Sequence, residues 1–154
     1  MSKPRVLFLC TSNSCRSQMA EGWARALKGD TIDAYSAGVE PHGMNLIAVR
    51  VMAEAGVDIA GQRSKHVDEL KDVPFDYVVT VCDEARQVCP VFPGVHESLH
   101  WGCDDPAEAE GTEEERLAVF RRVFLQLAER INQFIPLALR ERRERLDAAV
   151  VGGG

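Results

Sequence analysis

The sequence predicts a single α/β domain built on a four-stranded parallel sheet with helices on both faces. Two continuous apolar runs, residues 5–10 and 75–82, are typical of strands buried on both sides. Amphipathic stretches of helical period alternate with the strand-like segments, which indicates βαβ units. The length of 154 residues and the 45% hydrophobic share suit one domain with one core.

The expected strands and helices alternate along the chain. We expect strands at residues 5–10, 33–38, 75–82 and 97–101, the last being the weakest. The first helix should run over residues 16–28, where Met19, Trp23 and Leu27 recur at intervals of four. A second helix should cover residues 43–55 and end at Gly56.

The last helix should begin near residue 112. Thr112 is the expected N-cap, with Glu115 three residues later as in a capping box. Because proline disrupts helix interiors, Pro136 is expected to end the folded body. We therefore predict a domain over residues 1–136, followed by a charged and frayed extension over residues 137–154.

Composition and charge exclude several classes of protein. The net charge of −6 gives little support to non-specific nucleic-acid binding. No stretch reaches the roughly 20 apolar residues of a membrane helix, and polar "TSNS" interrupts the short apolar run near the start. A cytoplasmic protein without nucleic-acid or membrane partners is expected. The five cysteines lack the tight spacings of zinc ligands, so no metal site is predicted.

The segment "CTSNSCRS" leaves the carboxyl end of the first strand and runs directly into a helix. Backbone N–H groups of such a loop and of the helix start can converge on an anion, and Arg16 adds a bidentate donor. Cys10, at the rim of this cradle, should have a lowered pKa and accept a hydrogen bond from Ser17. The alternative is a polar turn that holds two ordinary core cysteines. The candidate anion-binding residues are Thr11, Ser12, Asn13, Ser14, Cys15, Arg16 and Ser17.

C-x5-R-S after a buried strand resembles the phosphate-binding loop of the low-molecular-weight protein tyrosine phosphatases. The resemblance covers about residues 4–135 and includes Asp105–Pro106, whose counterpart in that family supplies the general acid. It implies a phosphatase-like fold with Cys10 as the nucleophile. Cys15 is then a structural residue inside the loop.

Within this superfamily, the cysteines favour a reductase over a phosphatase. Cys82 ends the expected strand 75–82, on the same sheet edge as Cys10, and Cys89 follows seven residues later. No tyrosine follows Asp105–Pro106, where phosphatases usually carry tyrosines that stack on the phosphotyrosine ring. The segments "NSCRSQMAEG", "CP" and "HWGCDDPAEAEGTEEE" are similar to those of the thioredoxin-coupled arsenate reductases.

This resemblance implies a relay of three cysteines with no bound cofactor. Cys10 attacks arsenate, for which phosphate or sulfate can stand in, and Asp105 protonates the departing oxygen. Disulfides Cys10–Cys82 and Cys82–Cys89 then form in turn, and thioredoxin reduces the second. Since disulfides need Cα atoms about 4.4–6.8 Å apart and seven helical residues span about 10 Å, residues 83–92 should partly unwind on oxidation.

Three further points stay open at the level of sequence. A low-molecular-weight phosphatase is the alternative enzyme, and an inactive oxyanion-binding or redox-sensing module is the alternative of another class. Some reductases of this family bind potassium near the loop through an acidic residue and a hydroxyl residue. Glu21 supplies the acidic residue here, but Arg63 and Lys65 stand where the other ligands would be expected, and a cation site beside two basic side chains is unfavourable. We predict no potassium site, with Lys65 or Arg63 supplying the charge or both lying solvated at the surface. Cys103 has no partner in the relay, and packing is its expected role.

Overall fold

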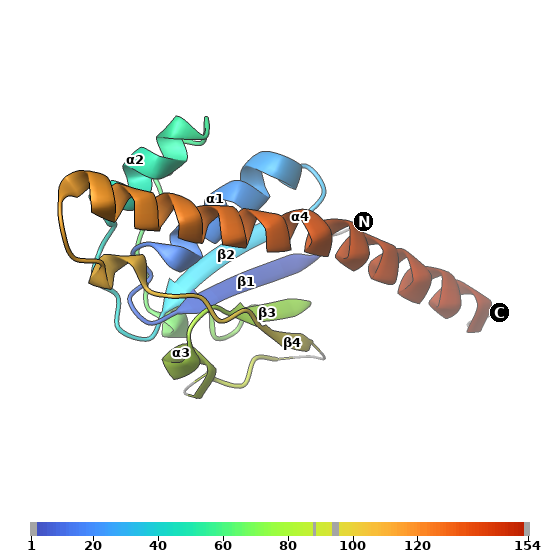
Figure 1. Ribbon diagram of the computed structural model, residues 1–154. Helices are drawn as coiled ribbons and strands as arrows, with labels where there is room; N and C mark the ends of the chain where they lie inside the picture. The colour runs from blue at the N-terminus through green and yellow to red at the C-terminus, as the bar shows by residue number, and fades with distance from the viewer. Residues whose placement is uncertain (1–2, 88, 94–95, 153–154) are drawn as a thin grey trace.

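A four-stranded parallel sheet forms the centre of the molecule. The computed structural model describes residues 3–87, 89–93 and 96–152. The strands lie in the order β2-β1-β3-β4, and each neighbouring pair is parallel (Figure 1). Their bounds are β1 Arg5–Cys10, β2 Asp33–Gly38, β3 Tyr77–Thr80 and β4 Glu97–His100. The predicted fold class is confirmed, although β3 is shorter at both ends than expected.

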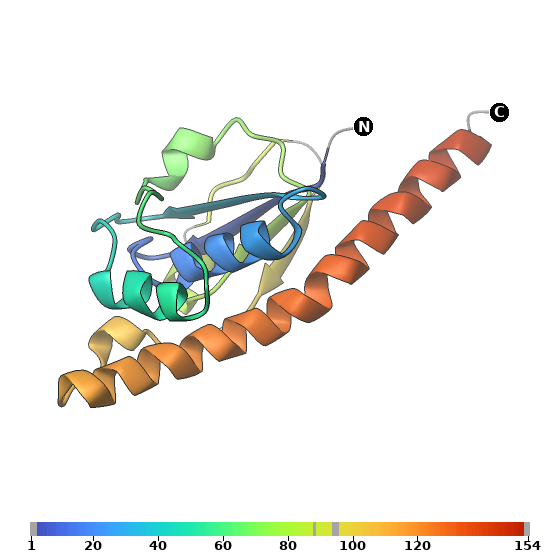
Figure 2. The same cartoon turned by 90° about the horizontal axis from the view of Figure 1, so that it is seen from above.

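Helices cover both faces of this sheet. Figure 2 shows the helices α1 (Arg16–Lys28), α2 (Leu46–Glu54) and α4 (Glu113–Gly152) on one face. The short helix η1 (Val67–Leu70) lies on the opposite face. On that side Phe75 packs edge-to-face on Phe92, with ring centroids 5.2 Å apart. Both faces of β1 are thereby buried, as its apolar run predicts.

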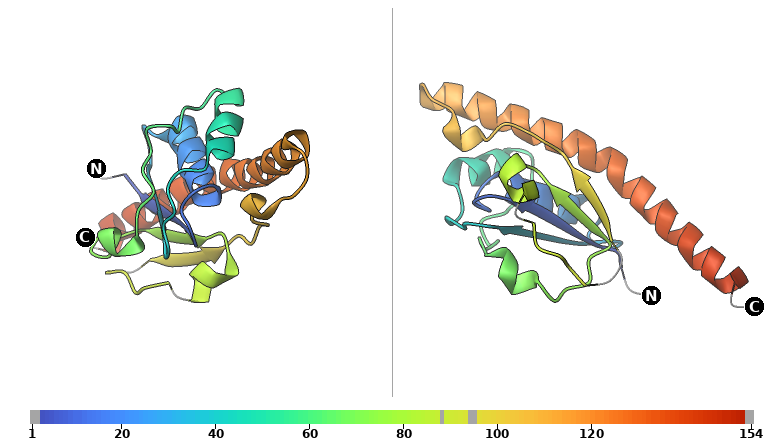
Figure 3. Two further views of the ribbon diagram at one scale, coloured as in Figure 1. Left: turned by 90° about the vertical axis from the view of Figure 1, so that its left-hand side faces the viewer. Right: turned by 90° about the horizontal axis from the view of Figure 1, so that it is seen from below.

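The strand register brings two cysteines to one edge of the sheet. β1 and β3 are adjacent and parallel, with Leu9 opposite Thr80. Cys10 and Cys82 follow these residues at the carboxyl ends. The left panel of Figure 3 looks onto this edge, where two short helices, α3 (Asp83–Gln87) and η2 (Pro106–Glu108), flank the loop between β1 and α1.

Helix α4 begins as predicted but does not end where predicted. The Glu115 N–H donates to Thr112 Oγ1 (3.2 Å), and the Thr112 N–H donates to the Glu115 carboxylate (3.4 Å), so the capping box forms. The helix then runs through Pro136 to Gly152 and extends past the sheet in Figure 2.

Burial on both sides of Pro136 accounts for this continuity. Ile135 and Ala138 are each 1% exposed, so the apolar face of α4 stays packed beyond the proline. One turn later, Tyr77 Oη donates to the Glu141 carboxylate (2.7 Å), and the Arg145 guanidinium lies over the Tyr77 ring. These contacts offset the hydrogen bond that a proline removes from a helix interior.

The continuity of α4 predicts the effect of replacing Pro136, whose side chain is exposed. Because Pro136→Ala restores a helical hydrogen bond and relieves a ring clash, it should raise the free energy of unfolding by about 1–3 kcal/mol. Urea titration of both proteins measures this. An unchanged midpoint would mean that the helix ends near residue 136 in solution.

Candidate active site

The loop between β1 and α1 is held from outside through its carbonyl groups. The carbonyl oxygens of Cys10, Thr11, Ser12 and Ser14 accept hydrogen bonds from backbone N–H groups within residues 39–45, at 2.8–3.3 Å. In a trans peptide the N–H group points opposite to the carbonyl. The N–H groups of the loop therefore face the other way, and that of Asn13 donates to the Cys10 sulfur. This arrangement is a candidate anion cradle of backbone donors.

Two positions show how tightly this loop is fitted. Asn13 has a φ of 50°, in the left-handed region that asparagine tolerates better than most residues. Gly38 ends β2 against the loop, and a Cβ atom there would lie 2.7 Å from the Thr11 carbonyl oxygen and 2.8 Å from the Asn13 nitrogen. Any larger residue at position 38 would displace the cradle.

Cys10 is hydrogen-bonded by the residues that the sequence places around it. Its sulfur lies 2.8 Å from Ser17 Oγ and accepts from the Asn13 N–H at 3.2 Å. Asn13 Nδ2 donates to Ser17 Oγ at 2.8 Å, which leaves the Ser17 hydroxyl proton free to point at the Cys10 sulfur. The distance and the free hydroxyl proton therefore agree with the expected hydrogen bond from Ser17 to the Cys10 sulfur.

The direction of the Cys10 pKa shift differs from the expectation. Cys10 is 1% exposed, and this burial raises the pKa of its thiol above the ordinary value. Hydrogen bonds from Ser17 and Asn13 and the charge of Arg16 act in the opposite direction but do not cancel the burial in this structure. The prediction of a lowered pKa considered only the donors and left out the cost of removing a thiolate from water.

Arg16 connects the cradle to the segment that carries the expected general acid. Its Nη1 donates to the Cys103 carbonyl oxygen (3.0 Å), and its Nη2 lies 3.7 Å from Asp105 Oδ2. Arg16 is 6% exposed, and its buried Nε has no hydrogen-bond partner among the residues that the structure describes. A buried donor of this kind suits an anionic ligand.

Asp105 and Cys15 lie side by side at the loop. Asp105 caps η2 by accepting from the Ala107 N–H (3.0 Å), and this bond fixes its carboxylate near Arg16. The Cys15 thiol is 2% exposed and lies 3.7 Å from Asp105 Oδ1. Burial, with the charge of Asp105 second, raises the pKa of Cys15 to about 11, so this thiol is a neutral part of the core. Its expected structural role agrees with these contacts.

Cys82 reaches the loop, whereas Cys89 does not. Cys82 Sγ lies 3.1 Å from the hydroxyl of Thr11, the neighbour of Cys10, and accepts from the Ala85 N–H (3.4 Å). Cys89 is half-buried at the far end of α3, where its thiol contacts the Pro90 carbonyl oxygen. All five cysteines are free thiols. The first two cysteines of the expected relay thus lie at the same edge of the sheet, with Cys82 against the neighbour of Cys10.

Lys65 lies behind the loop as an internal cation. Its Nζ donates to the carbonyl oxygens of Ser36 (2.8 Å) and Arg63 (3.0 Å) and lies 3.9 Å from Glu21 Oε1. The Lys65 backbone N–H donates to Asn13 Oδ1 (2.9 Å), which ties this group to the cradle. Arg63 instead pairs with Glu69 at the surface. Of the two basic residues considered, Lys65 is the one beside Glu21.

Two residues that the sequence analysis left out also contact the loop. Gln18 donates to the Asn13 carbonyl oxygen, Asn13 Oδ1 and the Arg63 carbonyl oxygen at 2.9–3.1 Å, and so fixes the strained residue of the loop. Glu84 accepts from the Thr11 hydroxyl at 3.4 Å. Helical spacing from Ser14 could have placed Gln18 near the loop, but no pattern in the sequence links residue 84 to residue 11.

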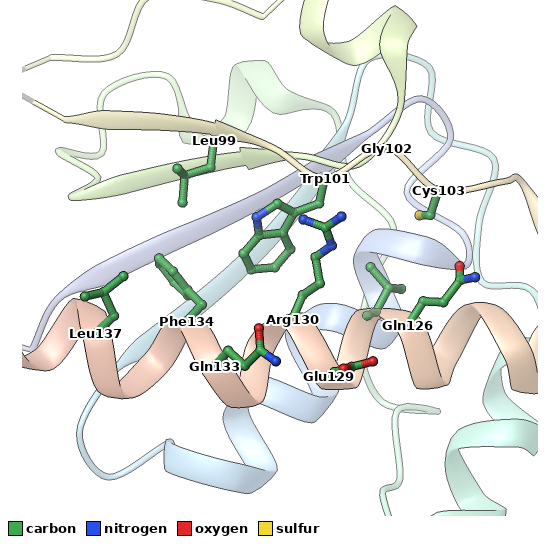
Figure 4. Close-up of a pocket in the computed structure, with 11 residues that line it drawn as sticks. Leu99, Trp101, Gly102, Cys103, Gln126, Glu129, Arg130, Gln133, Phe134 and Leu137 are labelled. Carbon is green, nitrogen blue, oxygen red and sulfur yellow. The ribbon is translucent and has the colours of Figure 1, made fainter.

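A separate groove of about 670 Å³ lies between β4 and α4. Figure 4 shows Trp101 and Phe134 inside it, Arg130 beside the indole ring and Cys103 at one end. Cys103 donates to the Val81 carbonyl oxygen (3.5 Å), and its own carbonyl is held by Arg16. None of the expected site residues lines this groove, and Cys103, for which packing is expected, lies at its end. In the described ranges no group of three or more His, Cys, Asp or Glu side chains could hold a metal ion.

Comparison with known proteins gives one family. Residues 5–146 match the model of the low molecular weight phosphotyrosine protein phosphatases. The curated arsenate reductase of Halalkalibacterium halodurans is 53% identical over 134 residues, which make up 87% of this chain and 96% of that relative.

Solved structures give the same result. A structure of an arsenate reductase in the phosphate-binding state is 32% identical, with a TM-score of 0.70 over 88% of this chain and 98% of the other. The thioredoxin-dependent arsenate reductase of Corynebacterium glutamicum is 26% identical, with a TM-score of 0.68 over 90% of this chain and 63% of the other. Among the helices described, none is both long and apolar enough to span a membrane.

The position of Lys65 predicts a specific loss of stability. Lys65→Ala leaves the buried Glu21 with one cation fewer, so the free energy of unfolding should fall by about 1–2 kcal/mol. Arg63→Ala is the matched control, since it removes an exposed ion pair and should change the value by less than about 1 kcal/mol.

Exchanging NaCl for KCl at equal ionic strength should leave the melting temperature of the unmodified protein unchanged. A higher melting temperature in KCl than in NaCl would show that potassium binds beside Lys65.

Proposed function

The chain belongs to the low molecular weight phosphotyrosine protein phosphatase family, and we propose that it is an arsenate reductase that takes its electrons from thioredoxin. The 53% identity to a curated arsenate reductase over most of both chains supports this activity. The observation that carries it in the site is the contact between Cys82 and Thr11, because it sets a second thiol beside the anion loop. Hydrolysis of a phosphate ester needs no such thiol.

The first step uses the cradle and Cys10. Arsenate is a tetrahedral oxyanion. Its oxygens can accept hydrogen bonds from the N–H groups of the loop and from the Arg16 guanidinium, whose Nε has no partner among the described residues. The bound anion lies beside Cys10, where donors toward the thiolate already stand at 2.8 and 3.2 Å. Cys10 attacks arsenic as the thiolate, after its thiol proton has passed to solvent, and Asp105 protonates the departing oxygen, which leaves as water.

Two thiols then complete the reduction. Cys82 attacks the Cys10 sulfur, so that an S–S bond forms, the S–As bond breaks and arsenic leaves as arsenite with the electron pair. Cys89 attacks Cys82 and releases Cys10, giving the Cys82–Cys89 disulfide. These two cysteines flank α3, so the disulfide requires that helix to rearrange within residues 83–92.

Thioredoxin then reduces the Cys82–Cys89 disulfide. The thioredoxin-dependent relative supports this donor, and the half-buried Cys89 is the more accessible of the two thiols. Such a cycle needs thiols that are kept reduced, which agrees with a cytoplasmic location. No bound cofactor enters the chemistry.

Phosphatase activity is the second candidate, and the family and the loop favour it in part. The residues after Asp105 disfavour a phosphotyrosine substrate. Pro106 is followed by Ala107, Glu108 and Ala109, which offer no aromatic ring and add negative charge near a site for anions.

Substitution of each relay cysteine separates the two activities. In a multiple-turnover assay with thioredoxin, its reductase and NADPH, Cys82→Ser and Cys89→Ser should lower arsenate-dependent NADPH oxidation by more than about a hundredfold, because each breaks the path to thioredoxin. Cys103→Ser is the control and should keep most of the activity. Full arsenate turnover by either relay variant would refute the relay. If these variants kept high activity on a phosphotyrosine peptide and the unmodified protein reduced no arsenate, the phosphatase would be the correct function.

A further inference from the structure

The side-chain amide of Asn13 has an orientation that its neighbours fix. Its Oδ1 accepts from the Lys65 backbone N–H and from Gln18 Nε2, both at 2.9 Å. Because a backbone N–H can only donate, the amide oxygen faces this side and the amide nitrogen faces Ser17. Asn13 Nδ2 accordingly donates to Ser17 Oγ at 2.8 Å. The Asn13 amide therefore connects Gln18 to the residue whose hydroxyl lies beside Cys10.

The side chain of Gln18 is oriented in the same way. Its Nε2 lies 2.9–3.1 Å from the Asn13 carbonyl oxygen, Asn13 Oδ1 and the Arg63 carbonyl oxygen, all of which can only accept. Its Oε1 accepts from Gln62 Nε2 at 2.8 Å, and the same nitrogen donates to the Gln18 carbonyl oxygen at 3.0 Å. Gln18 is fully buried, so water does not compete for these groups. The side-chain hydrogen bonds from Gln62 through Gln18 to Asn13 thus all point toward the loop.

This direction decides what the Ser17 hydroxyl can do. Its oxygen accepts from Asn13 Nδ2, so its one proton is available to the Cys10 sulfur at 2.8 Å. With the amide of Asn13 reversed, an oxygen would stand beside Ser17 and would compete with Cys10 for that proton. Backbone N–H groups of Ser17 and Asn13 and the charge of Arg16 also lower the pKa of Cys10, but the Ser17 hydroxyl has the largest of these lowering effects.

The Lys65 N–H does not duplicate the role of Gln18. It donates to the side-chain oxygen of Asn13, whereas Gln18 holds both that oxygen and the main-chain carbonyl of a residue with a left-handed φ of 50°. Gln18 also donates to the carbonyl of Arg63, two residues before Lys65. Loss of the Gln18 donors therefore loosens Asn13 directly and also loosens the segment that supplies its other donor.

We propose that Gln18 is a positioning residue for the nucleophile: it orients the Asn13 amide so that the Ser17 hydroxyl donates its proton to the Cys10 thiolate. The purpose of this role rests on the proposed function, in which Cys10 attacks as the thiolate. Ionisation of Cys10 is a property of the protein alone, so it can be measured with neither arsenate nor thioredoxin present. A shifted ionisation in a protein that reduces no arsenate would refute the reductase and keep the positioning role.

The variant Gln18→Met removes the donors and keeps a side chain of similar length. In protein labelled with ¹³C at the cysteine Cβ atoms, the resonance that is absent from Cys10→Ser belongs to Cys10, and its change with pH follows ionisation of that thiol. Because the Ser17 proton is no longer directed at the sulfur, Gln18→Met should raise the midpoint by about 0.5–1 pH unit, which means about three- to tenfold less thiolate at pH 7.

Met19→Ala is the matched control for a loss of packing. Met19 is the next residue of α1 and is fully buried, and its side chain is apolar. The cavity left by Met19→Ala should lower the melting temperature. Because the hydrogen bonds around Asn13 stay in place, the Cys10 midpoint should move by less than about 0.2 pH unit.

Two further variants test the anchor and the route. Gln62→Met is a milder change at a partly exposed residue, suited to the case in which Gln18→Met does not fold, and should raise the midpoint by about 0.3 pH unit. In a Ser17→Ala background, Gln18→Met should shift the midpoint less than half as far as in the unmodified protein. Unchanged midpoints in both glutamine variants, an equal shift in Met19→Ala, or half or more of the effect persisting without the Ser17 hydroxyl would overturn the proposal.

Discussion

The hydrogen bonds that hold the loop carbonyls from outside are the interaction on which the site depends. Backbone N–H groups within residues 39–45 fix four loop carbonyls and so direct the opposite faces of those peptides inward. Without this external frame, the short side chains of the loop would leave its N–H groups free to point to solvent. Gly38 contributes to the same frame because it lets β2 end directly against the loop.

The parallel sheet makes a three-thiol reaction possible over long sequence distances. Since β1 and β3 are neighbours in register, their carboxyl ends share one edge, and Cys82 contacts Thr11, the neighbour of Cys10, although 72 positions separate the two cysteines. The third thiol is reached differently. Cys89 lies past a short helix, so local rearrangement rather than strand register must bring it to Cys82. The proposed relay therefore uses the sheet to fix the nucleophile and requires α3, a helix of five residues, to rearrange when the second disulfide forms.

Several parts of the site could be predicted because they follow from local spacing. The strand end at Cys10, the helix start at Arg16 and the Ser17 hydroxyl all lie within eight residues, and the motif fixes their mutual geometry. The expected role of Asp105 comes from resemblance rather than from spacing, and resemblance leaves open whether Lys65 or Arg63 lies beside Glu21. The pKa of Cys10 was not predicted correctly, because burial depends on the packing of the whole sheet edge and no local pattern reports it. The course of α4 past Pro136 depends likewise on tertiary contacts, with Tyr77 and Glu141 as partners. Glu84 became visible only when the fold brought it to Thr11.

The most direct test of the account is the reaction of the reduced protein with arsenate in the absence of thioredoxin. The account predicts about one arsenite formed per chain, together with loss of two thiols and a disulfide that joins the peptide of Cys82 to that of Cys89. Arsenite formation with Cys82 still a free thiol would contradict the relay. Complete recovery of arsenate, with all five thiols still free, would contradict the reductase itself.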